Sequence, residues 1–241
     1  MPTNRKICAS IPIIEDQNSG TDNLEFTLCE IEKAIQKGAE MIECRFDFIK
    51  NYSRIDHYLQ LLIRYKDRCV YTLRPENEGG KFSNDPLKRI DLLKKLINAK
   101  PLFVDIEYEL ISGNDDLADL VEISDTRILV SWHNFVKTPS EDELISLVNN
   151  MRVYSPYLKI VTTAKNIDDS LTILKLYKLI DAHINLVAFA MGEPGTISRI
   201  LCSIIGDAPF TYASLSDAIA PGQLSIDQMK TFEKLFNSKL I

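Results

Sequence analysis

Eight short β-rich runs, separated by longer helical patterns, constrain the fold of this 241-residue chain. The runs lie at residues 7–12, 41–47, 69–74, 102–108, 127–133, 157–163, 184–190 and 209–214. Several are almost continuously apolar, which is typical of parallel strands covered by helices. Divided among eight strand–helix units, the chain gives about 30 residues a unit, the size of a minimal βα repeat. The pattern therefore predicts an α/β protein with a single (β/α)8 barrel over residues 1–241.

The segments between the runs carry the periodicity and punctuation of helices. Apolar residues recur at helical spacing over 24–35, and Gly38 follows where a C-terminal cap belongs. The segment 86–98 opens with proline, and Ser140 with Glu143 forms a capping-box pattern. No Gly/Ser-rich linker marks a second domain. An open doubly wound sheet is the alternative architecture, but eight regular units favour a closed barrel.

The composition disfavours several classes of partner. The formal net charge of -6 argues against nucleic acid, because proteins that bind it usually carry a basic face. No apolar stretch approaches the length of a membrane span, and the N-terminus has no signal-like cleavage site. The 5 cysteines include no C-x-x-C pair, so we expect Cys8, Cys44 and Cys69 to be buried thiols in a reducing compartment. These features predict a cytoplasmic protein with no nucleic-acid or membrane partner.

The motifs of the common cofactors are missing as well. Only 3 histidines occur, widely separated, so a zinc site would consist mainly of carboxylates, which zinc rarely uses alone. No G-x-G-x-x-G follows the first run, and Glu78-Gly79-Gly80-Lys81 lacks the Walker pattern of a phosphate loop. We therefore expect no metal and no organic cofactor.

Polar residues gather where the predicted strands end, which is where the active site of such a barrel lies. Period-two alternation puts Glu43, Arg45 and Asp47 on one face of the second run. If that face points into the barrel, its charges are costly unless they are paired or functional. A charged layer that merely fills the interior is the structural alternative. The other candidates at strand ends are Arg74, Glu78, Asp105, His133, Lys159, Arg199 and Gln223.

Lys159 and His133 carry the strongest chemical signal. Lys159 lies between Leu158 and Ile160 in an apolar run, and a desolvated lysine loses its proton more readily. This makes it a candidate Schiff-base nucleophile, although a buried lysine paired with a carboxylate would give the same pattern. His133 ends another apolar run, where a general base would lie, whereas His57 and His183 have polar surroundings typical of the surface.

The ordered motifs resemble those of the type I 3-dehydroquinate dehydratases over nearly the whole chain. The segments that carry the resemblance are Glu43-Cys44-Arg45, Leu73-Arg74 with Glu78-Gly79-Gly80, Ser131-Trp132-His133-Asn134-Phe135, Lys159-Ile160-Val161, Met191-Gly192 with Ile197-Ser198-Arg199, and Ala220-Pro221-Gly222-Gln223. The resemblance implies a lyase that dehydrates 3-dehydroquinate to 3-dehydroshikimate in the third step of the shikimate pathway. It also implies a small-molecule substrate, no cofactor and a homodimer.

The resemblance implies a role for each matching residue. Lys159 would form an imine with the C3 ketone, His133 would act as general base and acid, and Glu78 would orient His133. Arg199 would bind the substrate carboxylate, and Asp105 would support the histidine–glutamate pair. The residues expected to hold the ring hydroxyls and close the site are Glu43, Arg45, Arg74 and Gln223. Lys165 is a rival to Lys159, but it falls beyond the run and outside the motif.

One departure from the family pattern concerns the lid loop after the eighth run. Relatives commonly have a serine before Ala220-Pro221, where it helps to bind the substrate, and this chain has Ile219 there. Two alternative functions fit parts of the pattern. Another Schiff-base barrel enzyme, such as a class I aldolase, shares the lysine but needs a phosphate site that these motifs do not supply. A catalytically silent binding relative is disfavoured by the intact Lys159, His133 and Glu78.

Overall fold

The computed structural model describes residues 6–15, 24–83, 85–204, 206, 208–215 and 222–238, and over these the chain forms eight parallel strands. The strands are β1 (Lys6–Pro12), β2 (Met41–Arg45), β3 (Cys69–Thr72), β4 (Phe103–Glu107), β5 (Ile128–His133), β6 (Tyr157–Thr163), β7 (Asn185–Met191) and β8 (Phe210–Ser214). All eight predicted strands are present. The principal difference is in β2, which ends at Arg45, so Asp47 lies in the 3-10 helix Phe46–Phe48 that follows.

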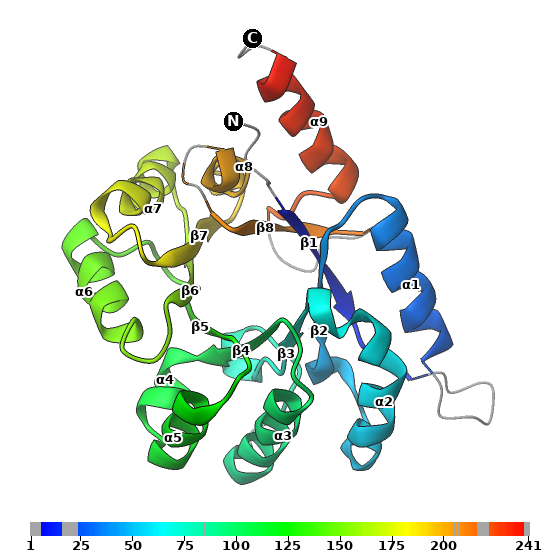
Figure 1. Ribbon diagram of the computed structural model, residues 1–241. Coiled ribbons are helices and arrows are strands. Elements are labelled where there is room, and N and C mark those ends of the chain that lie inside the picture. Colours follow the sequence, from blue (N-terminus) through cyan, green and yellow to red (C-terminus); the bar gives the residue numbers. More distant parts are fainter. Residues whose placement is uncertain are drawn as a thin grey trace.

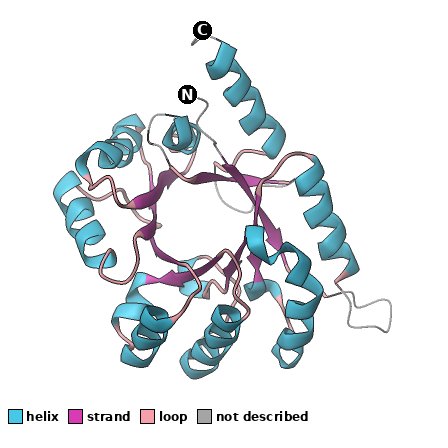
Figure 2. Cartoon of the chain, viewed as in Figure 1, coloured by secondary structure: helices cyan, strands magenta, loops and turns pink. Residues whose placement is uncertain are grey.

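The strands form a barrel with the helices outside it (Figures 1 and 2). Hydrogen bonding runs in the order β7-β6-β5-β4-β3-β2-β1-β8, and every pair is parallel. The rings of Phe189 on β7 and Tyr212 on β8, the two ends of this order, pack with their centroids 6.1 Å apart. This arrangement confirms the barrel and is not the open doubly wound sheet.

Helices follow each strand, and capping residues mark the ends of several of them. They are α1 (Glu25–Gln36), α2 (Ile55–Leu62), α3 (Pro86–Asn98), α4 (Tyr108–Ser112), α5 (Asp115–Ile123), α6 (Glu141–Met151), α7 (Ile167–Leu179), α8 (Thr196–Ile204) and α9 (Ile226–Ser238). The capping box of Ser140 and Glu143 is formed at the start of α6, as predicted. Gly38 has a positive φ of 93° just beyond α1, which is the conformation expected of a glycine at a helix end. Among the described helices, none has the length and apolar character needed to cross a bilayer.

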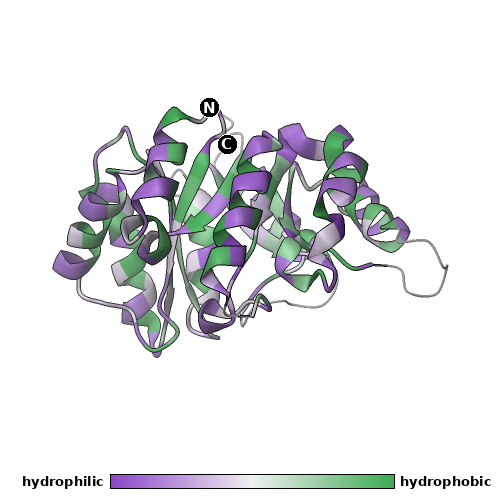
Figure 3. Cartoon of the chain, turned by 90° about the horizontal axis from the view of Figure 1, so that it is seen from below, coloured by the Kyte–Doolittle hydropathy of each residue, from purple (hydrophilic) through white to green (hydrophobic). Residues whose placement is uncertain are grey.

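Among the described residues, the two largest apolar clusters pack against the two faces of the barrel sheet. The larger one lies between the strands and the helices, whose hydrophilic and hydrophobic residues alternate around each helix in Figure 3. The smaller one fills the barrel interior and includes Cys8, Val70, Phe103, Leu129 and Phe210. Cys8, Cys44 and Cys69 are buried free thiols, as expected from their apolar runs.

The interior changes from apolar to polar along the strands. Side chains two residues apart on a strand point to the same face, so Val70 and Thr72 both face inward, as do Phe103 and Asp105. The residues near the N-terminal ends of the strands fill the barrel, whereas those near the C-terminal ends are charged or hydroxylated. The barrel floor is therefore closed by packing, and the polar layer above it is available to form a site.

Candidate active site

A pocket opens at the C-terminal ends of the strands and collects most of the predicted site residues. It is lined by Ser10, Glu43, Arg45, Arg74, Glu78, Gly79, His133, Phe135, Lys159, Val161, Phe189, Met191, Arg199, Tyr212 and Gln223. Asp105 lies beneath this lining and bonds to it. Ile219 lies outside the described residues, so its relation to the pocket stays a prediction.

Lys159 extends from β6 into the polar layer, where two carboxylates hold its ammonium. Its Nζ lies 3.1 Å from Oδ2 of Asp105 and 3.5 Å from Oε1 of Glu43, and the residue is 5% exposed. The expectation of a lysine surrounded by apolar side chains is therefore wrong, and the structure shows the alternative, a buried lysine paired with carboxylates. Leu158 and Ile160 belong to the outer core, because neighbours on a strand point to the opposite face.

The rival lysine has a different environment. Lys165 lies beyond β6 with an exposed side chain, and it does not line the pocket. Its backbone N–H donates to the Asp169 carboxylate at the start of α7. Lys159 is the lysine that the structure places against the other predicted site residues.

Hydroxyl groups fix the two carboxylates beside Lys159. Ser10 and Thr72 donate to Glu43 over 2.6 and 3.1 Å, and Ser131 donates to Asp105 over 2.6 Å. Burial alone would raise the pKa of Asp105, but the charges of Arg74 and Lys159 hold it well below its usual range. The pKa of Glu43 is lowered in the same way, by Lys159 and Arg45 against the effect of burial. Both groups are therefore anions in the resting site.

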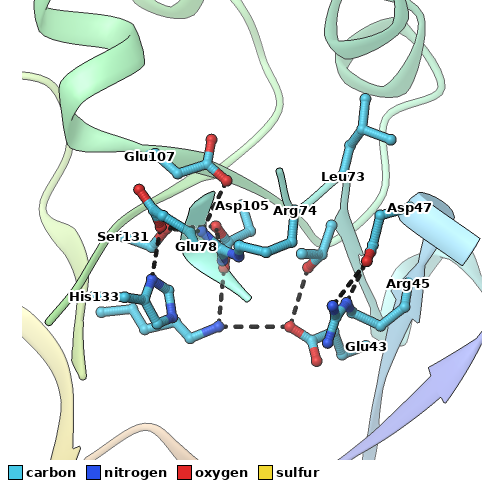
Figure 4. Close-up of polar contacts among 12 residues, drawn as sticks. Glu43, Arg45, Asp47, Leu73, Arg74, Glu78, Asp105, Glu107, Ser131 and His133 are labelled. Atoms are coloured by element: carbon cyan, nitrogen blue, oxygen red, sulfur yellow. Dashed lines mark hydrogen bonds and ion pairs between the residues drawn. The ribbon is translucent and has the colours of Figure 1, made fainter. Parts of the chain in front are cut away.

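Arg74 lies just past β3 and organises the acidic wall of the site, which consists of Glu78, Asp105 and Glu107 (Figure 4). Its guanidinium donates to Glu78, Glu107 and Ser131 through Nη1 and to Asp105 through Nη2, over 2.7–3.0 Å. The neighbouring carboxylates raise its pKa although burial opposes them. Arg74 thus acts in this structure as the cation that holds several carboxylates together, and its predicted contact with substrate hydroxyls stays a prediction.

Glu107 is held from behind by a residue that the sequence analysis missed. Arg89 on α3 is 7% exposed and pairs with Glu107 and with the carbonyl oxygen of Leu73. The sequence of α3 contained an indication that Arg89 would be buried, because Arg89 lies on the same helix face as Leu92 and Leu93. An arginine on an otherwise apolar helix face indicates a buried partner for its charge.

His133 and Glu78 form a hydrogen-bonded pair at the edge of the pocket. Nδ1 of His133 lies 2.9 Å from Oε2 of Glu78, and Phe135 stacks beside the imidazole with ring centroids 6.2 Å apart. Burial, together with the positive charges of Arg74 and Lys159, holds the pKa of His133 well below its ordinary value. Burial also raises the pKa of Glu78 to about 8, although Arg74 acts in the opposite direction. The imidazole is therefore neutral at physiological pH, as a general base must be.

The opposite wall, called the aromatic wall, comes from β7, α8 and β8 and carries Phe189, Arg199 and Tyr212. Arg199 on α8 is 2% exposed, and its guanidinium carbon lies 4.3 Å from the centroid of the Phe189 ring. Burial lowers the pKa of Arg199 to about 10, so it remains a cation at neutral pH. Tyr212 on β8 completes this wall, with Nζ of Lys159 4.4 Å from its ring centroid.

Arg45 and Asp47 flank the pocket at the end of β2. Nε and Nη2 of Arg45 each donate to one carboxylate oxygen of Asp47 over 2.8 Å (Figure 4). Asp47 also accepts from the backbone N–H of Lys81, which ties this pair to the loop after β3. The paired geometry fixes the planar guanidinium at the pocket wall.

The sequence analysis did not single out Tyr212, Phe189 or Ser10 as pocket residues. The alternation on β8 places Phe210 and Tyr212 on the inner face, so the signal for Tyr212 was its inward register and its position near the strand end. His57 and His183 are exposed, as expected. Within the described part of the chain, no group of three or more His, Cys, Asp or Glu side chains is arranged to hold a metal ion.

Comparison with known proteins assigns the chain to a family. The family model described as type I 3-dehydroquinase matches residues 20–239. The 3-dehydroquinate dehydratase of Pyrococcus abyssi is 34% identical over 206 residues, which cover 85% of this chain and 91% of that protein. The 3-dehydroquinate dehydratase of Methanocaldococcus jannaschii is 31% identical over 236 residues, which cover 95% of this chain and 99% of that protein.

Solved structures share the fold. A type I 3-dehydroquinate dehydratase from Clostridium difficile superposes with a TM-score of 0.82, with 24% identity, over 98% of this chain and 93% of that chain. The 3-dehydroquinate dehydratase of Geobacillus kaustophilus gives a TM-score of 0.79 over 98% of this chain and 93% of that chain, with 23% identity. With the family model matched over almost the whole sequence, the chain belongs to the type I 3-dehydroquinase family.

Proposed function

We propose that this type I 3-dehydroquinate dehydratase, a hydro-lyase that converts 3-dehydroquinate to 3-dehydroshikimate in the shikimate pathway, works through a Schiff base on Lys159. The observation that carries the proposal is the position of Lys159. Its amine lies inside the pocket between two carboxylates, and His133 lines the same pocket from the neighbouring strand β5. An amine nucleophile and a neutral general base therefore face one small volume.

The first step joins Lys159 to the C3 ketone of the substrate. The ammonium first loses a proton to a base in the pocket, and the free amine then adds to the C3 carbon. That proton and a second one from the nitrogen leave with the C3 oxygen as water, so the products are a protonated imine and one water. The imine nitrogen keeps a positive charge at the place where the ammonium carried it. Asp105 and Glu43 are already directed at this point, so the same carboxylates stabilise the cationic intermediate without rearrangement.

The second step is elimination, for which the imine is the electron sink. His133 takes the proton from C2, and the electron pair passes toward the imine to form an enamine. The pair then returns to expel the C1 hydroxyl, which leaves as water with the proton from His133. Hydrolysis of the remaining imine releases 3-dehydroshikimate and restores Lys159, so atoms and charges balance without a metal or an organic cofactor.

Glu78 sets the state of His133 in this scheme. When Glu78 is ionised, Nδ1 of His133 carries the hydrogen of their 2.9 Å contact, and Nε2 presents a lone pair. An imidazolium formed during proton transfer is then stabilised by the carboxylate beside it. Asp105 supports the pair indirectly, because Arg74 donates hydrogen bonds to both Asp105 and Glu78.

Arg199 is proposed to bind the substrate carboxylate, with Glu43, Arg45, Arg74 and Gln223 near the ring hydroxyls. Arg199 is a buried cation at the pocket wall opposite the acidic wall, and a carboxylate placed there would form a charge-assisted pair. This pair would orient the ring with its opposite side toward Lys159 and His133.

We also propose a homodimer located in the cytoplasm, as the family resemblance and the cysteine pattern indicate, with no nucleic-acid partner. Light scattering on the purified chain measures the oligomeric state, and a fluorescent fusion in the source cell tests the cytoplasmic location. A monomer in solution would contradict the dimer and leave the catalytic proposal intact.

Borohydride trapping tests the central proposal. Reduction during incubation with 3-dehydroquinate should leave a secondary amine on Lys159, located by peptide mapping. Lys159→Ala should lose this label and lower kcat by more than roughly a thousandfold, because no other group supplies the electron sink. Lys165→Ala is the matched control, since it removes an exposed lysine close in sequence, and it should keep both label and turnover. A label on Lys165, or near-normal turnover by Lys159→Ala, would overturn the proposal. Turnover of aldol donors in place of 3-dehydroquinate would favour the class I aldolase alternative.

A further inference from the structure

Arg89 is a buried cation that lies outside the active-site pocket. It belongs to α3, is 7% exposed and does not line the pocket. Together with Glu107 it lines a second cavity, and Glu78 lines both cavities. A buried charge is costly unless it is paired, so the partners of Arg89 indicate what it does.

The two partners of Arg89 both belong to the surroundings of Arg74. Nε and Nη2 of Arg89 donate to the carbonyl oxygen of Leu73 over 3.3 and 3.2 Å, and this carbonyl belongs to the peptide group that joins Leu73 to Arg74. Nη2 also donates to Oε2 of Glu107, whose other oxygen accepts from Nη1 of Arg74 over 2.8 Å. Arg89 therefore holds Arg74 at both ends, through the backbone and through a carboxylate that the guanidinium contacts.

The guanidinium of Arg74 contacts the residues beside the reacting groups (Figure 4). Nη1 donates to Oε2 of Glu78 over 3.0 Å, and this oxygen lies 2.9 Å from Nδ1 of His133. Nη2 donates to Asp105 over 2.7 Å, and the other oxygen of Asp105 lies 3.1 Å from Nζ of Lys159. A continuous series of contacts thus leads from the arginine on α3 to the proposed general base and to the proposed nucleophile.

We propose that Arg89 is a positioning residue for the dehydration, which holds Glu107 and the peptide before Arg74 so that Arg74 stays bonded to Glu78. This inference rests on the proposed roles of His133 and Glu78, and it extends them to a residue outside the pocket. Within the described part of the chain, Glu107 bonds to Arg74 and Arg89. Without Arg89, the Glu107 carboxylate would draw Arg74 toward itself and away from Glu78.

The protonation of Glu78 reports this change. Burial raises the pKa of Glu78 to about 8, the charge of Arg74 opposes the rise, and the negative charge of Glu107 adds to it. The titratable and charged groups that face Glu78 are Arg74 after β3, Asp105 and Glu107 on β4, Glu109 on α4 and His133 on β5. A weaker contact with Arg74 disfavours the ionised carboxylate, so loss of Arg89 should raise the pH at which Glu78 loses its proton.

The test measures the midpoint of the rise in kcat/KM with pH that follows ionisation of Glu78, with 3-dehydroquinate as substrate. In Arg89→Met this midpoint should move upward by about one pH unit, because a nearby opposite charge shifts a pKa by about 1–3 units. Glu107→Gln should move the midpoint downward, because it removes a negative charge that faces Glu78. The double variant Arg89→Met/Glu107→Gln removes both charges and keeps an oxygen acceptor for Arg74, so its midpoint should return to near the wild-type value.

Shifts of opposite sign separate positioning from a purely structural role. A loss of stability alone would lower activity in all three variants without moving the midpoint. Arg89→Lys keeps the cation and should recover most of the wild-type midpoint. Lys88→Met is the matched control, because it removes an exposed cation from the neighbouring position of α3, and it should keep the wild-type midpoint.

The outcomes distinguish this inference from the proposed function. An unchanged midpoint in Arg89→Met, while Glu78→Gln abolishes the rise, would overturn the inference alone. If Arg89→Met does not fold, equal midpoints in Glu107→Gln and the double variant would overturn it in the same way. A rise that persists in Glu78→Gln would overturn the proposed His133–Glu78 pair and the inference with it. The borohydride label on Lys159 tests the Schiff base independently of all these variants.

Discussion

Two buried arginines reach the same pocket from opposite sides of the barrel, and their surroundings differ. Arg74 follows β3 and bonds to Glu78, Asp105 and Glu107, which raise its pKa against the effect of burial. Arg199 belongs to α8, after β7, and lies over the Phe189 ring, where burial lowers its pKa to about 10. Both are almost completely buried, so burial alone does not decide the state of such a group.

The difference teaches how one pocket combines rigidity with recognition. The cation of the acidic wall is used by the protein to hold several carboxylates at fixed positions. The cation of the aromatic wall lies in surroundings that disfavour its charge, so an incoming carboxylate gains more by binding there. Removal of Arg74 should therefore act mainly on the free energy of unfolding, whereas removal of Arg199 should act mainly on substrate affinity.

The largest effect is expected from Arg74→Met. It leaves Glu78, Asp105 and Glu107 close together without the cation between them, and breaking a buried ion-pair network costs about 3–5 kcal/mol. Urea denaturation followed by circular dichroism should show a free energy of unfolding lower by that amount at neutral pH. The loss should shrink in acid, where the carboxylates become protonated. An unchanged unfolding midpoint would show that the acidic wall does not depend on Arg74.

The next effect is expected from Arg199→Ala, and it should appear in binding. A hydrogen bond to a charged group contributes about 1.5–3 kcal/mol, so KM for 3-dehydroquinate should rise by roughly 10- to 150-fold. The unfolding free energy should fall by less than in Arg74→Met, because burial already disfavours the Arg199 charge. Arg199→Lys is the matched variant and should recover part of the affinity. A normal KM in Arg199→Ala would show that another residue binds the substrate carboxylate.

A smaller effect concerns Glu78, which joins the acidic wall to His133. With its pKa raised to about 8, the pair loses a proton near that pH and frees Nε2 of His133 to act as a base. The fraction of enzyme in this form rises roughly tenfold between about pH 7 and 9, and kcat/KM should follow. In Glu78→Gln the amide oxygen accepts from Nδ1 at every pH, so this rise should disappear. The same rise in the variant would assign the titration to another group.

The same pKa shift predicts the direction of a stability change. The folded-state pKa of Glu78 lies above its unfolded value of about 4.3, so the native state favours the neutral carboxyl. This contribution is complete below about pH 4.3 and is lost as the pH rises through about 8. The free energy of unfolding of Glu78→Gln should therefore fall less than that of the wild type over this range. Parallel pH profiles for the two proteins would contradict the assignment.

The sequence predicted well those features that depend on local order along the chain. β6 spans the expected residues 157–163, and α3 begins at the expected proline, because strand and helix patterns follow from neighbours in sequence. The positions of Lys159, His133 and Glu78 at predicted strand ends indicated that the three side chains would lie close together. All three line the pocket. A barrel brings such ends together whatever the details of the loops.

The sequence could not predict which distant groups would contact Lys159. Asp105 lies on β4 and Glu43 on β2, so their contacts with β6 depend on the register of several strands. The partners of Arg89 and Tyr212 also come from other elements, so the position of each residue on its own element could indicate burial but not the contact that it makes. The apolar neighbours of Lys159 suggested an apolar environment, but alternation directs them to the outside of the barrel.

The smallest effect is expected from Ile219→Ser, in the segment that follows the aromatic wall. Relatives commonly have a serine at this position, and isoleucine lacks the hydroxyl needed to bond to a substrate. A neutral hydrogen bond contributes about 0.5–1.5 kcal/mol, so kcat/KM for 3-dehydroquinate should rise by no more than roughly tenfold. The gain should come through KM, as with the loss in Arg199→Ala, because both changes act on substrate binding. Ile219→Val is the control for altered bulk and should leave kcat/KM nearly constant. A gain far above tenfold, or a collapse of activity, would show that Ile219 makes contacts in this enzyme on which catalysis depends.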